Sequence, residues 1–166
     1  MRILGIDPGY GITGFGLIEA ERGQSRLLGC GAITTPAGMD FSARLEMIYE
    51  DMRSLLEQTK PDAVAIEELF FGHNVTTGIG VAQARGVVLL AIRQAGLEVT
   101  AYKPMQVKQA LVGYGNATKH QMQDMTKRLL HLQAMPKPDD AADAIAIALC
   151  HARSNTSLIA QAQRML

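Results

Sequence analysis

Several features that mark special classes of protein are scarce or missing in this sequence. The chain has only two cysteines, Cys30 and Cys150, which lie far apart and outside any CxxC pair. They fit neither a disulfide framework nor a zinc site, so we expect a reducing, cytoplasmic compartment. The apolar stretch 86–92 is too short to span a membrane, and the four residues between Arg2 and Asp7 are too few for the core of a signal peptide. We therefore expect no membrane partner.

Net charge is also lacking. The 166 residues include 16 Lys and Arg and 16 Asp and Glu, which gives a formal net charge of zero. The overall charge therefore gives no support for a nucleic-acid partner. The charge is unevenly distributed, however, because residues 99–138 contain six Lys or Arg and one acid, a local charge of +5 before the histidines. Such a basic half is suited to binding phosphates, although a solvated helix face explains Lys127 and Arg128 equally well.

Internal repeats and linkers are absent too, which predicts a single domain over residues 1–153 and a C-terminal tail over 154–166 that frays. Alternation and turn residues predict strands over 2–7, 13–20, 26–35, 61–67 and 99–102. Helical spacing predicts helices over 41–58, 74–95, 104–112, 118–132 and 139–153. A meander of three strands followed by alternating helices and strands favours an α/β fold, a mixed five-stranded sheet with helices on both faces.

Acids at the start of an apolar helix are the least ordinary feature. The stretch PKPDDAADAIAIAL covers residues 136–149. Asp139 is explained as a helix N-cap and Asp140 as a first-turn acid favoured by the helix dipole. Neither explanation applies to Asp143, because it lies a turn further into a helix that is apolar on every side. None of its helical neighbours is basic. A buried carboxylate is costly unless paired, so we expect a cation from elsewhere in the fold. A distant Lys or Arg is one candidate, and a divalent metal suits two converging acids better.

Two further acids end predicted strands. Asp7 ends the first strand and Glu67 ends the strand 61–67, and ligands of α/β sheets gather at the carboxyl ends of strands. We therefore expect Asp7, Glu67, Asp140 and Asp143 to converge on Mg²⁺ or Mn²⁺, which favour hard oxygen donors. Two such ions about 4 Å apart can activate a water and stabilise the leaving oxygen of a phosphodiester. The alternative is three unrelated features: a turn Asp, a strand-end Glu and a helix cap.

Several blocks of the sequence stand in an order known from one protein family. They are Ile6-Asp7-Pro8-Gly9 with Thr13-Gly14, Ala65-Ile66-Glu67, residues 80–86 (GVAQARG), Gln106-Val107-Lys108-Gln109 and Asp140-Ala141-Ala142-Asp143-Ala144. Together they resemble the RuvC family of bacterial Holliday junction resolvases from about residue 2 to residue 152. The resemblance implies an RNase H-like fold and a homodimer. It implies a Mg²⁺-dependent endodeoxyribonuclease that resolves four-way (Holliday) junctions in recombination and repair by nicking two symmetric strands.

The resemblance also assigns residues and partners. It implies that the catalytic and metal-binding residues are Asp7, Glu67, Asp140 and Asp143, with two Mg²⁺ ions per active site and Mn²⁺ as a substitute. It implies DNA contacts by Phe70, Lys108 and Lys119, and it makes the branch-migration proteins RuvA and RuvB expected partners.

Some interpretations stay open at this stage. One of Phe70 and Phe71 is expected in the core, and the other is available to unstacked bases. Glycines such as Gly80 and Gly86 in the helix 74–95 permit close approach of another backbone, either a two-fold partner or the chain's own sheet. A non-catalytic protein that recognises branched DNA by shape would also have the basic half. An ATPase of the actin and sugar-kinase type would share the Asp7 loop, but it needs two related halves and leaves Asp140 and Asp143 unexplained.

Overall fold

An antiparallel meander and two parallel strands form one sheet in the order β3-β2-β1-β4-β5. The computed structural model describes residues 1–69 and 75–164. Its strands are β1 (Arg2–Asp7), β2 (Ile12–Glu21), β3 (Gln24–Thr34), β4 (Ala63–Glu67) and β5 (Val99–Tyr102). Pairing of β1 with β2 and of β2 with β3 is antiparallel, whereas β4 pairs in parallel with β1 and with β5. The mixed five-stranded sheet predicted from the sequence is thus confirmed.

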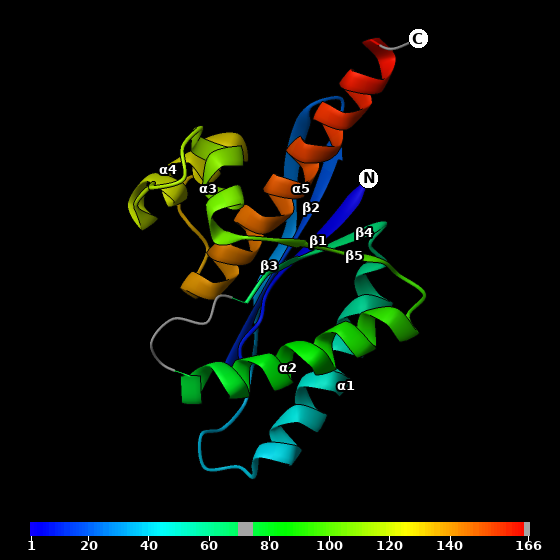
Figure 1. Ribbon diagram of the computed structural model, residues 1–166, viewed down its shortest axis with the longest axis vertical. Helices are drawn as coiled ribbons and strands as arrows, with labels where there is room; N and C mark the ends of the chain where they lie inside the picture. The colour runs from blue at the N-terminus through cyan, green and yellow to red at the C-terminus, as the bar shows by residue number, and fades with distance from the viewer. Residues whose placement is uncertain (70–74, 165–166) are drawn as a thin grey trace.

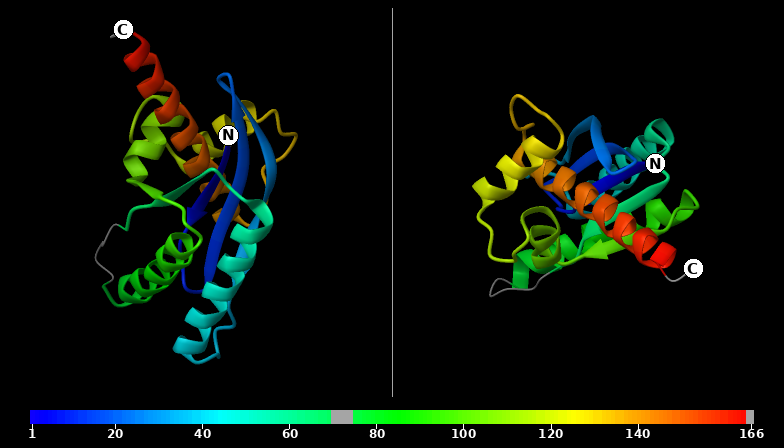
Figure 2. Two further views of the ribbon diagram at one scale, coloured as in Figure 1. Left: turned by 90° about the vertical axis from the view of Figure 1, so that its right-hand side faces the viewer. Right: turned by 90° about the horizontal axis from the view of Figure 1, so that it is seen from above.

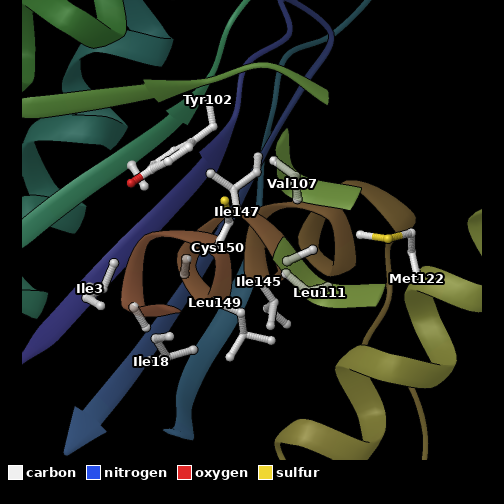
Figure 3. Packing of buried hydrophobic residues seen from close by; sticks show 14 of the residues in the cluster. Ile3, Ile18, Tyr102, Val107, Leu111, Met122, Ile145, Ile147, Leu149 and Cys150 are labelled. Carbon is white, nitrogen blue, oxygen red and sulfur yellow. The ribbon is translucent and has the colours of Figure 1, made fainter. Parts of the chain in front are cut away.

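Helices cover both faces of this sheet (Figures 1 and 2). They are α1 (Phe41–Thr59), α2 (Val75–Gln94), α3 (Pro104–Val112), α4 (Lys119–Leu129) and α5 (Asp139–Arg164). One buried cluster joins α1 and α2 to Leu4 and Ile6, which point to one side of β1. A second joins α5, α3 and α4 to Ile3 and Ile18 on the opposite side. Figure 3 shows this second cluster, with α5 between the sheet residues Ile3 and Ile18 and the α3 side chains. Alternation along β1 therefore sends Asp7, two positions after Gly5, to the face that α5 covers.

Helix α5 packs directly against the backbone of β1 and β2. A Cβ added at Gly5 would lie 2.0 Å from the carbonyl oxygen of Ala144, and one at Gly16 would lie 2.5 Å from Ile145. A Cβ at Gly14 would lie 2.1 Å from the carbonyl oxygen of Asp140. Any side chain at these positions would push α5 away from the sheet. The glycines therefore fix how deeply the acidic start of α5 is seated.

Two helix ends differ by more than one residue from the sequence prediction. Helix α4 ends at Leu129 rather than residue 132, because Leu130 is the C-cap and His131 adopts a positive φ of 53°. Helix α5 continues through residues 154–164, the segment that sequence patterns assign to a separate tail. None of the helices in the described part of the chain combines the length and the apolar character that a membrane span needs.

Candidate active site

Strand register places the first two acids side by side. Because β1 and β4 are parallel neighbours with Ile6 paired to Ile66, Asp7 and Glu67 end adjacent strands at the same edge of the sheet. Ala65 belongs to the buried cluster beneath α5, so Glu67, two positions later, points to the same face as Asp7. Alternation predicts that Glu68 points away from this face, and Glu68 indeed lines a different cavity.

The start of α5 brings a third acid to this edge. Asp143 lines a cavity of about 230 Å³ together with Asp7 and Glu67. Asp140 lies one turn earlier and, although it does not line the cavity, its charge acts on both Asp7 and Asp143. The backbone contact between Asp140 and Gly14 holds this end of the helix in place. The structure therefore gathers three predicted acids in one cavity and sets the fourth beside it.

Side-chain clamps shape the turn that follows Asp7. The Thr13 hydroxyl donates to the carbonyl oxygen of Gly9 at 2.6 Å, and the backbone N–H of Gly9 donates back to Thr13 Oγ1 at 3.4 Å. Arg44, a buried residue of α1, donates to the carbonyl oxygen of Tyr10 at 3.2 Å and to Thr35 Oγ1 at 2.8 Å. These bonds tie the turn to β2, β3 and α1, and they account for Thr13 in the block that resembles the family.

The end of β4 is held from α2. Arg85 Nε donates to the carbonyl oxygen of Glu67 at 3.2 Å. This bond gives Arg85, part of the stretch GVAQARG, a physical role in placing Glu67. Sequence reasoning missed that role, because nothing in the helical pattern links residue 85 to residue 67.

The acids raise one another's proton affinity. Burial is the largest cause that raises the pKa of Asp7 to about 7, and the charges of Glu67, Asp143 and Asp140 raise it further. Burial and the charge of Asp143 also raise the pKa of Glu67, while Lys108 opposes this change. Burial raises the pKa of Asp143 despite the opposing charge of Lys119. Burial is thus the main cause of the raised pKa at all three acids, and repulsion from neighbouring acids adds to it.

A lysine supplies part of the expected counter-charge. Lys119, at the start of α4, pairs with Asp139 at 2.9 Å and with Asp143 at 3.6 Å. The sequence left a distant Lys or Arg open as the cation at Asp143 while favouring a divalent metal, and Lys119 is a lysine of that kind. Within residues 1–69 and 75–164, however, no ion pair reaches Asp7 or Glu67.

The donor set fits a divalent cation. Asp7, Glu67, Asp140 and Asp143 offer only carboxylate oxygens, the ligands that Mg²⁺ and Mn²⁺ prefer. Burial, and after it the neighbouring acids, raise the pKa of Asp7, so a bound cation would stabilise its ionised form. As the side chains stand in the described part of the chain, no three acidic, His or Cys groups are already arranged around one metal position, and Asp143 is turned towards Lys119.

The predicted DNA-binding residues have different outcomes. Lys108 of α3 and Lys119 of α4 both line the cavity that contains the acids. Phe70 lies outside the described residues. Gly80 packs within the chain, because a Cβ there would lie 2.9 Å from the Tyr10 ring. Gly86, by contrast, has no atom within 4 Å of an added Cβ.

Comparison with known proteins identifies the family. Residues 3–151 match the family model for crossover junction endodeoxyribonuclease RuvC. The chain belongs to the RuvC family. It is 54% identical over 158 residues to crossover junction endodeoxyribonuclease RuvC of Chloroflexus aurantiacus, covering 95% of this chain and 96% of that protein. It is 55% identical over 153 residues to the same enzyme of Brevibacillus brevis, covering 92% of each.

Solved structures agree with this assignment. The RuvC structure of Thermus thermophilus matches with a TM-score of 0.88 at 38% identity, covering 95% of this chain and 96% of that one. The same enzyme in complex with a Holliday junction substrate matches with a TM-score of 0.87 at 36% identity, with the same coverage. The yeast mitochondrial Holliday junction resolvase Ydc2 has a TM-score of 0.72 at 14% identity and shows the shared fold alone. The expected RNase H-like resolvase fold is therefore confirmed, and the non-catalytic alternative has no support among these matches.

Proposed function

We propose that this RuvC family nuclease resolves four-way DNA junctions by Mg²⁺-dependent hydrolysis at the cavity formed by Asp7, Glu67 and Asp143. The observation that supports this proposal is the convergence of acids from β1, β4 and α5 next to Lys108 and Lys119. Such a cavity combines carboxylates for metal ions with cations for phosphate. A protein that only recognised the shape of branched DNA would have no need for the acids, whose mutual repulsion destabilises the fold.

Each charged group in or beside the cavity has a proposed part in the reaction. Asp7, Glu67, Asp140 and Asp143 would hold the Mg²⁺ ions, two per site in our proposal, with Mn²⁺ as a substitute. Bound Mg²⁺ supplies an activated water and stabilises the leaving oxygen of the phosphodiester. Lys108 and Lys119 stabilise the negative charge that develops on the phosphate oxygens. To do so, Lys119 exchanges its contact with Asp143 for one with the DNA.

Substitution of Asp7 tests the division between binding and cutting. Asp7→Asn keeps the size of the side chain, removes its charge and replaces one acceptor oxygen by an NH₂ donor. We expect a synthetic four-way junction to be bound with an affinity within about threefold of wild type and cut at least about 100-fold more slowly, because removal of one transition-state interaction costs about this much. Asp51→Asn, at an exposed position on α1, serves as the matched control. Full activity of Asp7→Asn in Mg²⁺, or of the wild type in EDTA, would contradict the proposed site.

A homodimer is part of the proposal. On α2, Ile79, Gln83, Gly86 and Leu90 form an exposed stripe at spacings of four, three and four residues, the spacing at which helices pair lengthwise. Ile79 and Leu90 are each 53% exposed, which is unusual for large apolar side chains. Gly86 between them lowers helix stability and leaves open space, which a partner helix can fill. A two-fold dimer suits a junction with two symmetric strands to cut.

Membership of the family supports two further partners. We propose RuvA and RuvB as the proteins that deliver junctions to this nuclease, in the cytoplasm. Co-sedimentation of the purified chain with a junction that RuvA and RuvB already occupy tests this assignment, and its absence at micromolar concentrations would contradict it.

A further inference from the structure

A second cavity adjoins the acidic one. It has a volume of about 510 Å³, within the range of roughly 300–1,000 Å³ found for small-ligand sites. Pro104 and Lys108 line both cavities. The second cavity therefore opens beside the position at which the proposed reaction places the scissile phosphate.

The wall of this second cavity is mostly apolar and contains an unusually exposed methionine. Leu69, Pro104, Met105 and Gly115 provide the apolar surface. The Met105 residue is 62% exposed, the largest exposed fraction among the large hydrophobic residues that the structure describes as exposed. Its side chain lies over Gly115, where an added Cβ would come within 2.5 Å of Met105 Cγ and 3.2 Å of its sulfur. Gly115 thus leaves room for a flexible, polarisable thioether at the surface, a group that packs well against aromatic rings.

Charged groups stand at the edge of the cavity. Lys103 and Lys108 make no ion pair within the described part of the chain, so both ammonium groups are available to phosphates. Glu68 is exposed on the same cavity and provides a carboxylate acceptor. Amino groups at the edges of nucleobases are the donors that such an acceptor selects. Together these groups match the parts of a nucleotide. The apolar wall suits the ring of the base, the two cations suit phosphates, and the carboxylate acceptor suits an amino group at the edge of the base.

We propose that this cavity, centred on Met105, receives one nucleobase next to the scissile phosphate and contributes to the sequence preference of cleavage. The inference rests on the proposed junction-cutting function and adds a base-reading site to it. The base lies against Met105, Lys103 holds the flanking phosphate while Lys108 stays on the scissile one, and Glu68 favours a base that carries an exocyclic amino group. Continuity with the acidic cavity favours a base of the bound strand over any other occupant.

A double-mutant cycle between protein and DNA tests this site. Junctions are prepared in which each nucleotide around the cut is replaced, one at a time, by an abasic site. Equilibrium binding in EDTA, where no cutting occurs, is then measured for wild type and Met105→Ala. We expect one position at which the abasic site weakens binding to wild type by about 2- to 10-fold more than it weakens binding to Met105→Ala, which is the range for a sulfur–ring contact. Coupling of this kind requires that side chain and base touch.

Two controls separate base reading from general effects. Met39→Ala removes another exposed methionine, 38% exposed and located before α1, and should show no coupling at any position. Glu68→Gln should reduce discrimination between bases at the coupled position and leave binding of the abasic junction unchanged. Because Met105 and Glu68 are exposed, unfolding midpoints should stay within about 2 °C of wild type.

The outcomes distinguish this inference from the function on which it rests. A wild type that cuts junctions but shows no position coupled to Met105 overturns the base site alone. The base site is also overturned if Met105→Ala weakens binding equally for every junction. It is overturned as well if Met105→Ala changes the sedimentation coefficient of the free protein, because the cavity would then be a contact between two copies of the chain. A wild type that shows the coupling but cuts nothing in Mg²⁺ contradicts the proposed function and leaves the base site standing.

Discussion

Replacement of Asp7 by Asn should stabilise the metal-free protein at pH 8. Burial and three neighbouring acids raise the pKa of Asp7 to about 7, from an ordinary value near 3.8. The folded state therefore holds a proton on Asp7 that the unfolded state has already released between these two pH values. A group of this kind favours folding at low pH, and its contribution is lost as the pH rises from about 4 to 7.

The size of the effect follows from the difference in pKa. At about 1.4 kcal/mol for each pH unit, ionised Asp7 costs the fold up to about 4 kcal/mol above pH 7, and salt screening of the neighbouring charges reduces this to about 2–4 kcal/mol. Asn at position 7 carries no charge to repel Glu67 and Asp143. We therefore expect Asp7→Asn to exceed wild type in free energy of unfolding by about 2–4 kcal/mol at pH 8 and by about 1 kcal/mol at pH 5.

Urea unfolding in EDTA, followed by circular dichroism at pH 5 and pH 8, measures both differences. Addition of Mg²⁺ should reverse the order at pH 8, because wild type gains stability from a bound ion and the variant has lost one ligand. Asp51→Asn, exposed on α1, should match wild type throughout. If Asp7→Asn is less stable than wild type at pH 8 in EDTA, or its advantage is the same at both pH values, then burial and repulsion do not raise the proton affinity of Asp7 and the reasoning is refuted.

Two further predictions concern the surroundings of the site. Leu90→Glu should weaken self-association by about 30-fold or more, since apolar residues at the centre of an interface contribute about 2 kcal/mol or more. Analytical ultracentrifugation measures the dissociation constant of the dimer, and Ile12→Glu, at a position that is 41% exposed, is the control. An unchanged dimer in Leu90→Glu would rule out the α2 stripe as the interface. Asp139→Asn removes one negative charge and the 2.9 Å partner of Lys119, so Mn²⁺ affinity at low salt should fall about 3- to 10-fold, and the free energy of unfolding should change by less than about 1 kcal/mol. Calorimetry should show no such loss of Mn²⁺ affinity for Asp124→Asn, which breaks another solvent-exposed pair, with Arg128. Equal losses in both variants would contradict a specific role for Asp139.

Much of the fold follows from local patterns in the sequence. Alternation in β1 and the apolar run in β4 decide which face Asp7 and Glu67 occupy, so their convergence needs only the parallel pairing of two neighbouring strands. In the same way, the helical spacing of apolar residues predicts α1 and α5, because it indicates the face of each helix that packs on the sheet. The end of α4 is missed, because the turn at His131 depends on a positive φ that no local residue type demands.

The support around the site could not be predicted in this way. The bond from Arg85 to the carbonyl oxygen of Glu67 and the pairing of Lys119 with Asp139 join residues whose proximity depends on how whole helices are placed. Sequence reasoning assigned a close approach to the glycines of α2. Within the chain, helix α5 comes very close to the sheet at Gly5, Gly14 and Gly16, where the strands lack side chains, and an approach of a partner to Gly86 stays a prediction.

That arrangement explains how the chain tolerates its own acids. Repulsion among Asp7, Glu67 and Asp143 favours separation of α5 from the strand ends, and a helix held only by side-chain contacts can shift outward to relieve it. In this fold the helix backbone rests on bare strand backbone, with the carbonyl oxygens of Asp140 and Ala144 over Gly14 and Gly5, and its apolar side chains fill the core around Ile145 and Leu149. Outward movement would therefore open a void in a tightly packed layer, which costs several kcal/mol per large side chain exposed. The free energy gained by burying α5 thus outweighs the repulsion among the acids. The acids therefore stay close together at the edge of the sheet, where a cation would stabilise them.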